Sequence, residues 1–339
     1  IFKRFPDKEE MENALNTLEV EIKDTLNDEE IQQLEEASSQ WTVANADNFQ
    51  KQIIKTVSEV TGREFNVMGA TYVDWVPSPE IILNDVTLSN TKGSTRGVML
   101  SIPRVSIQLT WKSLLKNPLV IDKITVENPV LYLERTAPEK VNWNFSFIGK
   151  NAIESSMLGV NSNFVQTRID NLQVKNGVLN YVNAVTNSTV ELLNINGKIT
   201  LDSLQGPYLF NGSVQGGENS FLTRLSINQL TTDIPVPFSL EMKAKDESLS
   251  LNLDGQFLTQ SKKLDLSADG SFFVKKPNEI LKTLGLLQLN SALNIPAQGG
   301  LTYTAQNGID SIKNFTVRFG DNEDSVALTA SVSREDKSG

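Results

Sequence analysis

The sequence predicts a mostly β protein with short helices, in which one elongated, curved antiparallel sheet follows a helical N-terminal segment. Three observations lead to this fold class. Apolar and polar residues alternate along many short segments between residues 65 and 332, which is typical of strands with one apolar face. Turn sequences such as TKGSTRG and QGGENS separate these segments, as expected between the strands of hairpins. A similar phrase also recurs along the chain, as in proteins built from repeats.

Residues 1–45 differ from the rest of the chain because they are rich in acidic residues and contain no glycine. Apolar residues recur there at helical spacing, at Met11, Leu15, Leu18, Ile22 and Leu26. This spacing predicts an amphipathic helix or helical hairpin with a solvated acidic face. The alternative is a coiled coil or a helix that binds a partner. We therefore treat residues 1–45 as an acidic helical extension.

A short helix is expected over residues 46–61, where the main domain begins. Its apolar stripe consists of Phe49, Ile53, Val57 and Val60. Asn45 or Asp47 would cap its N-terminus. Gly62 would end it, because glycine adopts the left-handed conformation at little cost. Arg63 follows directly, and we expect it to bind main-chain carbonyl oxygens, with phosphate binding as the alternative.

Residues 46–332 form the predicted β domain, and residues 333–339 form a polar tail. In segments such as VSIQLTW, FSLEMKA and LSLNLDG, every second residue is apolar. Alternate side chains of a strand lie on one face, so these residues predict a single apolar face. The candidates for that face are Val105, Ile107, Leu109, Phe238, Leu240, Met242, Leu249, Leu251, Leu253, Leu264, Leu266, Phe315, Val317 and Phe319. Residues 149–159 and 276–287 have a helical pattern instead.

The recurring phrase has the form apolar, Asn or Asp, apolar, any residue, apolar. It occurs in EIILNDVTLSN, IDKITVENPVLYLE, RIDNLQVKNGVLNYVN and IDSIKNFTVRFGD. Asp85, Asp122 and Asp170 belong to it, and we expect them to bind local backbone at strand entries or turns. An enzyme of the β-helix type, with acidic residues side by side on neighbouring coils, is the alternative.

The composition excludes several classes of function. The net charge is −10 and the sequence pI is about 4.8, which argues against a nucleic-acid partner because such partners require a basic surface. The chain contains no cysteine and no histidine, so it has no thiol nucleophile, imidazole base or Cys/His zinc site. GDNED lacks the spacing of a calcium-binding EF-hand loop and is expected to be a turn. We predict that the protein is not an enzyme and has neither a cofactor nor a metal site.

The apolar face itself has two interpretations. It could cover a second sheet, as in a closed sandwich or barrel. Alternatively, it could line an open groove that holds acyl chains, because large exposed apolar surfaces usually mark binding sites. The alternation of residues does not distinguish between these two architectures.

A resemblance to a known family favours the groove. The helix ending in Thr61-Gly62-Arg63, a strand with Gly69, the turn Val76-Pro77-Ser78-Pro79 and the strand Leu83-Asn84-Asp85-Val86 follow one another in that order. A Leu114-Leu115 segment, a phrase ending at Pro129 and the pair Asn142-Trp143 come next. In this order the elements strongly resemble the bacterial AsmA family, over residues 46–332.

The resemblance implies a fold, a function and a location. AsmA proteins are similar to bridge-like, chorein-type lipid transfer proteins, in which an open, taco-like sheet holds phospholipid chains on its apolar face. The expected partners are therefore a phospholipid or another acyl lipid and the inner membrane, through an anchor outside this chain. The expected location is the periplasmic face of the inner membrane in a bacterial cell envelope, with a role in outer-membrane biogenesis. A non-catalytic assembly factor that binds envelope proteins through sheet edges is the alternative.

Overall fold

The computed structural model describes residues 43–74, 79–109, 121–137, 140–143, 169–185, 187–203, 205–217, 219–231, 234–260, 263–278, 295–306, 309–320 and 326–335. The predicted helical extension before residue 43, the helix at 149–159 and nearly all of the helix at 276–287 lie outside these residues.

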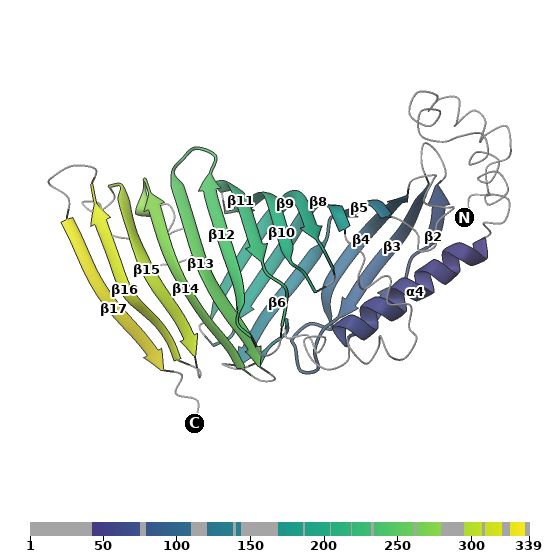
Figure 1. The fold of residues 1–339 in the computed structure, drawn as a ribbon, viewed down its shortest axis with the longest axis horizontal. Helices are drawn as coiled ribbons and strands as arrows, with labels where there is room; N and C mark the ends of the chain where they lie inside the picture. The colour runs from purple at the N-terminus through teal and green to yellow at the C-terminus, as the bar shows by residue number, and fades with distance from the viewer. Residues whose placement is uncertain are drawn as a thin grey trace.

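The described residues form one helix and a single curved sheet of seventeen strands, which confirms the predicted fold class (Figure 1). The helix is α4 (Val43–Thr61). The strands are β1 (Phe65–Val67), β2 (Thr71–Asp74), β3 (Glu80–Ser89), β4 (Val98–Leu109), β5 (Ile121–Glu127), β6 (Val130–Ala137), β7 (Lys140–Val141), β8 (Ile169–Asn183), β9 (Ser188–Leu201), β10 (Tyr208–Gly216), β11 (Asn219–Ile227), β12 (Val236–Ala244), β13 (Leu249–Gln260), β14 (Lys263–Val274), β15 (Ala297–Gln306), β16 (Ile309–Phe319) and β17 (Val326–Glu335).

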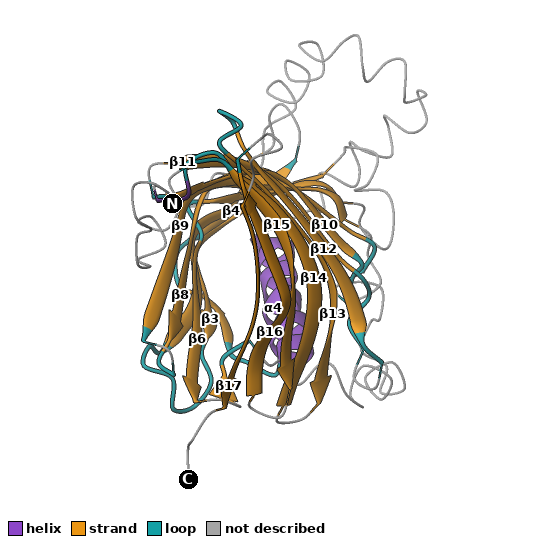
Figure 2. Cartoon of the chain, turned by 90° about the vertical axis from the view of Figure 1, so that its left-hand side faces the viewer, coloured by secondary structure: helices purple, strands orange, loops and turns teal. Residues whose placement is uncertain are grey.

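The strands are arranged along one axis, with α4 at one end and β17 at the other (Figure 1). From β8 to β17 each strand pairs antiparallel with the next one along the chain. Seen from the β17 end, the sheet is strongly curved and α4 lies at the far end, within the outline of the curve (Figure 2). The predicted meander of hairpins therefore accounts for the second half of the sheet.

The first half departs from a purely antiparallel sheet at one place. β5 and β6 both pair with β8 in parallel. Parallel neighbours need a connection of a dozen or more residues, and residues 144–168 separate Trp143 from β8. Alternation along individual strands carries no information about this crossover, so the sequence did not predict it.

The helix α4 begins at Val43, three residues before the expected start. The proposed caps Asn45 and Asp47 therefore lie inside the helix, and that prediction was wrong. Ala44 and Ala46 flank Asn45, and alanine is the best helix former. Gly62 has φ of 64° and ends the helix as predicted.

The recurring Asn/Asp phrase marks a row of left-handed residues inside the sheet. Asp85, Asn128 and Asn176, which lie in the phrase, each have φ of 52°, and Asn194 of β9, which lies outside the phrase, has φ of 47°. Asn and Asp tolerate this conformation better than other residues that carry a side chain. Asp85 is therefore a mid-strand residue of β3, and the expectation that it enters a strand was wrong, whereas Asp122 and Asp170 do lie at the starts of β5 and β8.

These left-handed residues lie at one level across neighbouring strands. Arg104 of β4 pairs with Asn84 and with Glu127, so Asp85 and Asn128 flank β4 at the same height. The Asn128 amide donates to the Lys175 carbonyl (2.8 Å), directly before Asn176. The register of β8 against β9 shifts there, and such bulges bend a strand and increase its twist. The row therefore forms a crease along which the first half of the sheet bends.

Replacement of Asn176 tests the crease. Asn176→Ala is expected to lower the free energy of unfolding by about 1–2 kcal/mol, because alanine is strained at positive φ. Asn176→Gly is expected to change it by less than about 0.5 kcal/mol, because glycine adopts this conformation freely. Urea denaturation followed by circular dichroism measures both values, and equal losses in the two variants would contradict a left-handed strand residue here.

Candidate functional site

One face of the sheet is apolar from end to end, and we call it the inner face. Its residues lie directly opposite one another from strand to strand. A row that runs from β3 to β13 consists of Ile81, Ile107, Ile124, Leu172, Ile199, Phe210, Leu225, Leu240 and Leu253. The register therefore places the predicted apolar residues of distant segments on one continuous surface.

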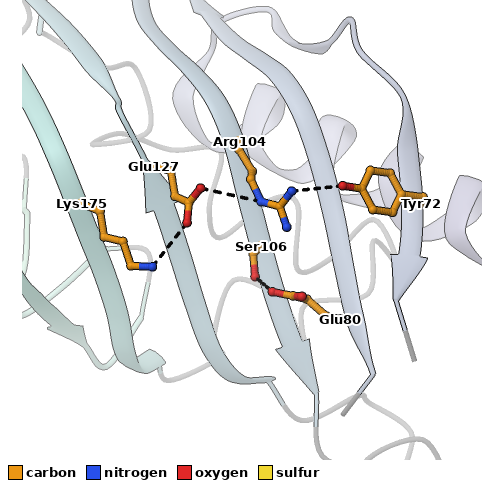
Figure 3. Close-up of polar contacts among 6 residues, drawn as sticks. All are labelled: Tyr72, Glu80, Arg104, Ser106, Glu127 and Lys175. Atoms are coloured by element: carbon orange, nitrogen blue, oxygen red, sulfur yellow. Dashed lines mark hydrogen bonds and ion pairs between the residues drawn. The ribbon is translucent and has the colours of Figure 1, made fainter. Parts of the chain in front are cut away.

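The opposite face, which we call the outer face, carries polar and charged side chains (Figure 3). Arg104 donates to the Tyr72 hydroxyl (3.1 Å) and lies 3.8 Å from the Glu127 carboxylate. Lys175 lies 3.3 Å from the other oxygen of Glu127, and Ser106 donates to Glu80. Such half-exposed ion pairs contribute little to stability, but they show that charged side chains gather on this part of the outer face.

The inner face has two sections that differ in what covers them. In the first, on β3 to β5, the side chains are buried: Ile81 and Leu109 have no exposed area, and Leu83 has 1%. Ile53 of α4 belongs to this cluster, and Ile54 and Val57 pack against it. Among the sequence candidates, Val105, Ile107 and Leu109 lie in this section, beneath the helix. We call it the covered section.

The second section extends from β8 to β17, and its central side chains are only half-buried. Most of the sequence candidates lie here on the inner face, and those that are half-buried are Phe238, Leu240, Met242, Leu249, Leu251, Leu253, Leu266 and Phe315. Val317 and Phe319 are buried in a small cluster with Ala297. Leu264 lies opposite Thr259 in the same register. We call this the open section.

Several phenylalanine rings of the open section lie over glycines on neighbouring strands. A Cβ atom at Gly255 would lie 2.8 Å from the ring of Phe238, and one at Gly197 of β9 would lie 2.6 Å from the ring of Phe210. The ring of Phe272 similarly covers Gly299 on the next strand. Because these glycines leave room for the rings to lie flat, the floor of the open section is smooth and aromatic.

The junction of the two sections is also apolar. Tyr208 of β10 packs against the covered cluster, and burial raises the pKa of its phenol to about 12. A shift of this sign results when the charged form loses contact with water. The inner face therefore shields the Tyr208 phenol from water where the covered section ends.

The alternation of residues did not identify a substantial part of the inner face. Leu172, Ile199, Phe210, Leu225 and Phe272 belong to it through the strand register. In β8 and β9 the bulges at Asn176 and Asn194 shift the alternation, and in β10 and β15 glycines interrupt it. At Asn176 the recurring Asn phrase was the available signal, because it marks a position where the parity changes, whereas Asn194 lies outside the phrase.

A buried polar cluster lies where α4 joins the sheet. Arg63 is 8% exposed; its guanidinium donates to the carbonyl oxygen of Asn142 and contacts the Met99 sulfur at 3.6 Å. Burial lowers the pKa of Arg63. Arg63 was expected to cap carbonyl oxygens at the end of α4, whereas this hydrogen bond goes to a main-chain carbonyl in a turn far away in the sequence.

Asn142 organises the other side of this cluster. It is 2% exposed, accepts from the Glu134 amide (2.8 Å) and donates to the Tyr132 carbonyl (2.7 Å). Glu134 in turn accepts from the Thr95 amide. The two short motifs of the sequence analysis, Gly62-Arg63 and Asn142-Trp143, therefore meet in space and hold the helix end against β6.

The described residues offer little for acid–base or metal chemistry. Within them, no three acidic side chains lie close enough together to hold a metal ion. Asp85, Asp122 and Asp170 lie on three different strands. In the same part of the chain, no helix is both long and apolar enough to cross a membrane.

Comparison with known proteins gives one match. The AsmA family matches residues 41–311. Searches of curated proteins and of solved structures found no match. The matched region begins with α4 and includes the covered section, the crease and most of the open section, and AsmA proteins are generally non-catalytic and associated with the bacterial envelope. The order of motifs, the curved sheet and the match over most of the chain lead to one conclusion: this chain belongs to the AsmA family.

Proposed function

We propose that this chain binds the acyl chains of phospholipid in the open section of its inner face and transfers lipid within the bacterial envelope. The observation that carries the proposal is that the inner face stays apolar from β8 to β16 while its central side chains, such as Leu240, Leu251 and Leu253, are only half-buried. An apolar surface of this extent normally marks a binding site. Family membership supports an envelope role, and we place the protein on the periplasmic face of the inner membrane.

The chemistry of the two faces suits an amphipathic ligand. Burial of apolar surface contributes about 25 cal/mol per Å², so hydrocarbon laid along the inner face is stabilised without any specific polar contact. The outer face carries ion pairs such as Arg104 with Glu127 and remains in water. The lipid head group would stay at the rim of the sheet, where both solvent and polar turns are available.

The dimensions also suit a lipid. Strands lie about 4.8 Å apart, so the ten strands from β8 to β17 extend over roughly 40 Å. The smooth floor formed by phenylalanine rings over glycines provides few obstacles to a sliding chain. Binding and transfer of this kind need no nucleophile, base or cofactor, and we propose that the protein is not an enzyme.

Native mass spectrometry of the purified chain, with lipid extraction from the same sample, tests the proposal. We expect phospholipid to be retained in a stoichiometric complex and to be displaced by a competing detergent. A folded, lipid-free chain that also fails to take up phospholipid from vesicles would overturn the proposal.

A second candidate function rests on the edge of the sheet. Among the described residues, β17 pairs only with β16. An unpaired edge can accept a strand from another protein, as an assembly factor for the outer membrane would require. Binding of an envelope protein that persists in a lipid-free variant would favour this alternative.

A further inference from the structure

We propose that α4 occupies the covered section in place of ligand, and that the inner face of β3 to β5 binds lipid when the helix moves aside. The inference rests on the proposed function of the open section. It adds a second lipid-binding section and a helix that plugs it.

The first argument is the continuity of the surface. Ile107 of β4 lies opposite Ile124 of β5, which lies opposite Leu172 of β8. Leu172 in turn lies opposite Ile199 of β9. No polar or charged residue interrupts this row between the two sections. The strands themselves are therefore alike, and among the described residues the covered section differs from the open section by the presence of α4.

The second argument is the nature of the cover. Ile53, Ile54 and Val57 present aliphatic groups to the covered section, whereas Lys51, Lys55 and Glu59 on the helix are exposed. Acyl chains would supply the same kind of contact to Ile107 and Leu109. Because apolar burial is non-directional, exchange of α4 for hydrocarbon would keep the strand residues away from water.

The third argument is how α4 is attached. The hydrogen bonds that tie it to neighbouring structure, among the described residues, come from its last turn and the residues after it. The Arg63 amide donates to the Ser58 carbonyl (3.2 Å), the Phe65 amide to the Ser58 hydroxyl (3.1 Å) and the Glu64 amide to the Ser89 hydroxyl (3.0 Å). Arg63 then binds Asn142. Ile53, Ile54 and Val57 are held by apolar contact, so the described part of the helix has a fixed end beside Gly62 about which it can swing.

Photo-crosslinking with a phosphatidylethanolamine that carries a diazirine in its acyl chain tests the inference. The full chain is incubated with vesicles containing this probe, and crosslinked peptides are identified by mass spectrometry. Three proteins are compared. They are the unchanged chain, Ile53→Asp, which weakens the packing of α4 on the sheet, and Lys51→Asp, which places the same side chain on the exposed side of the helix. Peptides of β13 report on the open section, and peptides of β4 report on the covered section.

We expect crosslinks on β13 in all three proteins. On β4 we expect about a tenfold higher yield in Ile53→Asp than in the other two, since the substitution raises the population of the displaced helix. An unchanged β4 yield in Ile53→Asp, with β13 crosslinks present, would overturn the plug but leave the proposed function intact. An absence of crosslinks on β13 in all three proteins would instead overturn the proposed function.

A purely structural helix would give a different result. Weaker packing of α4 on the sheet would then lower the melting temperature of the protein. It would also reduce crosslinking on β4 and β13 together. If Ile53→Asp loses its cooperative thermal transition, Ile53→Ala replaces it with the same criteria, because alanine removes apolar contact without adding charge.

Discussion

Leu251→Glu is expected to weaken phospholipid binding by at least about tenfold, whereas Gln256→Glu on the same strand leaves it within about twofold. Leu251 lies on the inner face of the open section, opposite Met242 and Phe272. A carboxylate at this position would face acyl chain on one side and apolar side chains on the other. Removing an unpaired charge from water costs free energy. Acyl chains would therefore no longer bind over this part of the inner face.

Gln256 provides a matched control for the charge. It is exposed and lies on the outer face, opposite Pro237 and Ser267. Glutamate has nearly the same shape as glutamine, so the variant adds the same charge to the same strand without touching the inner face. Transfer of a fluorescent phospholipid between vesicles and equilibrium binding of the same lipid measure both variants, with circular dichroism as the test of folding. Equal losses in two folded variants would show that the inner face does not hold the lipid.

Asn142→Ala is expected to lower the free energy of unfolding by about 3 kcal/mol, since it removes the hydrogen-bond partner of one buried and one partly buried main-chain group. These groups are the Glu134 amide and the Tyr132 carbonyl, which now bond to the Asn142 side chain at 2.8 and 2.7 Å. The packing of Trp143 against Tyr181, with ring centroids 5.8 Å apart, depends on the same turn. The substitution therefore loosens the site where Arg63 anchors the end of α4.

Asn252→Ala is the control for this second prediction. Asn252 is exposed, and its side chain makes one long contact, 3.4 Å to the Ser271 hydroxyl. Its loss is expected to change the free energy of unfolding by less than about 0.5 kcal/mol. Urea denaturation measures both variants, and a loss below about 1 kcal/mol for Asn142→Ala would contradict the anchoring role.

Alternation predicted the strands and one apolar face well, because the side-chain period of a strand is two and each face meets a different solvent. Leu240, Met242, Leu251 and Leu253 illustrate this: all four lie on the inner face in mutual register. Where the backbone leaves the regular strand conformation, as at Asn176 and Asn194, the parity shifts and the same rule assigns residues to the wrong face.

The sequences of the strands could not predict which segment of the chain packs against the inner face. Ile107 and Leu251 look alike in sequence, yet Ile107 is 4% exposed beneath α4 and Leu251 is half-buried in the open section. What separates them is a contact between segments far apart in the chain, here Ile53 against the β3 to β5 cluster. Local pattern describes the surface of a strand, and only tertiary structure shows what lies against it.

The consecutive antiparallel pairing of the strands from β8 to β17 has a consequence for how such proteins diverge. A hairpin contains an even number of strands, so its duplication or loss leaves the remaining strands in phase and keeps every apolar side chain on its original side. Each hairpin changes the reach of the sheet by about 10 Å. The fold can therefore act as a molecular ruler whose length evolves in fixed steps while the chemistry of its surface is inherited unchanged.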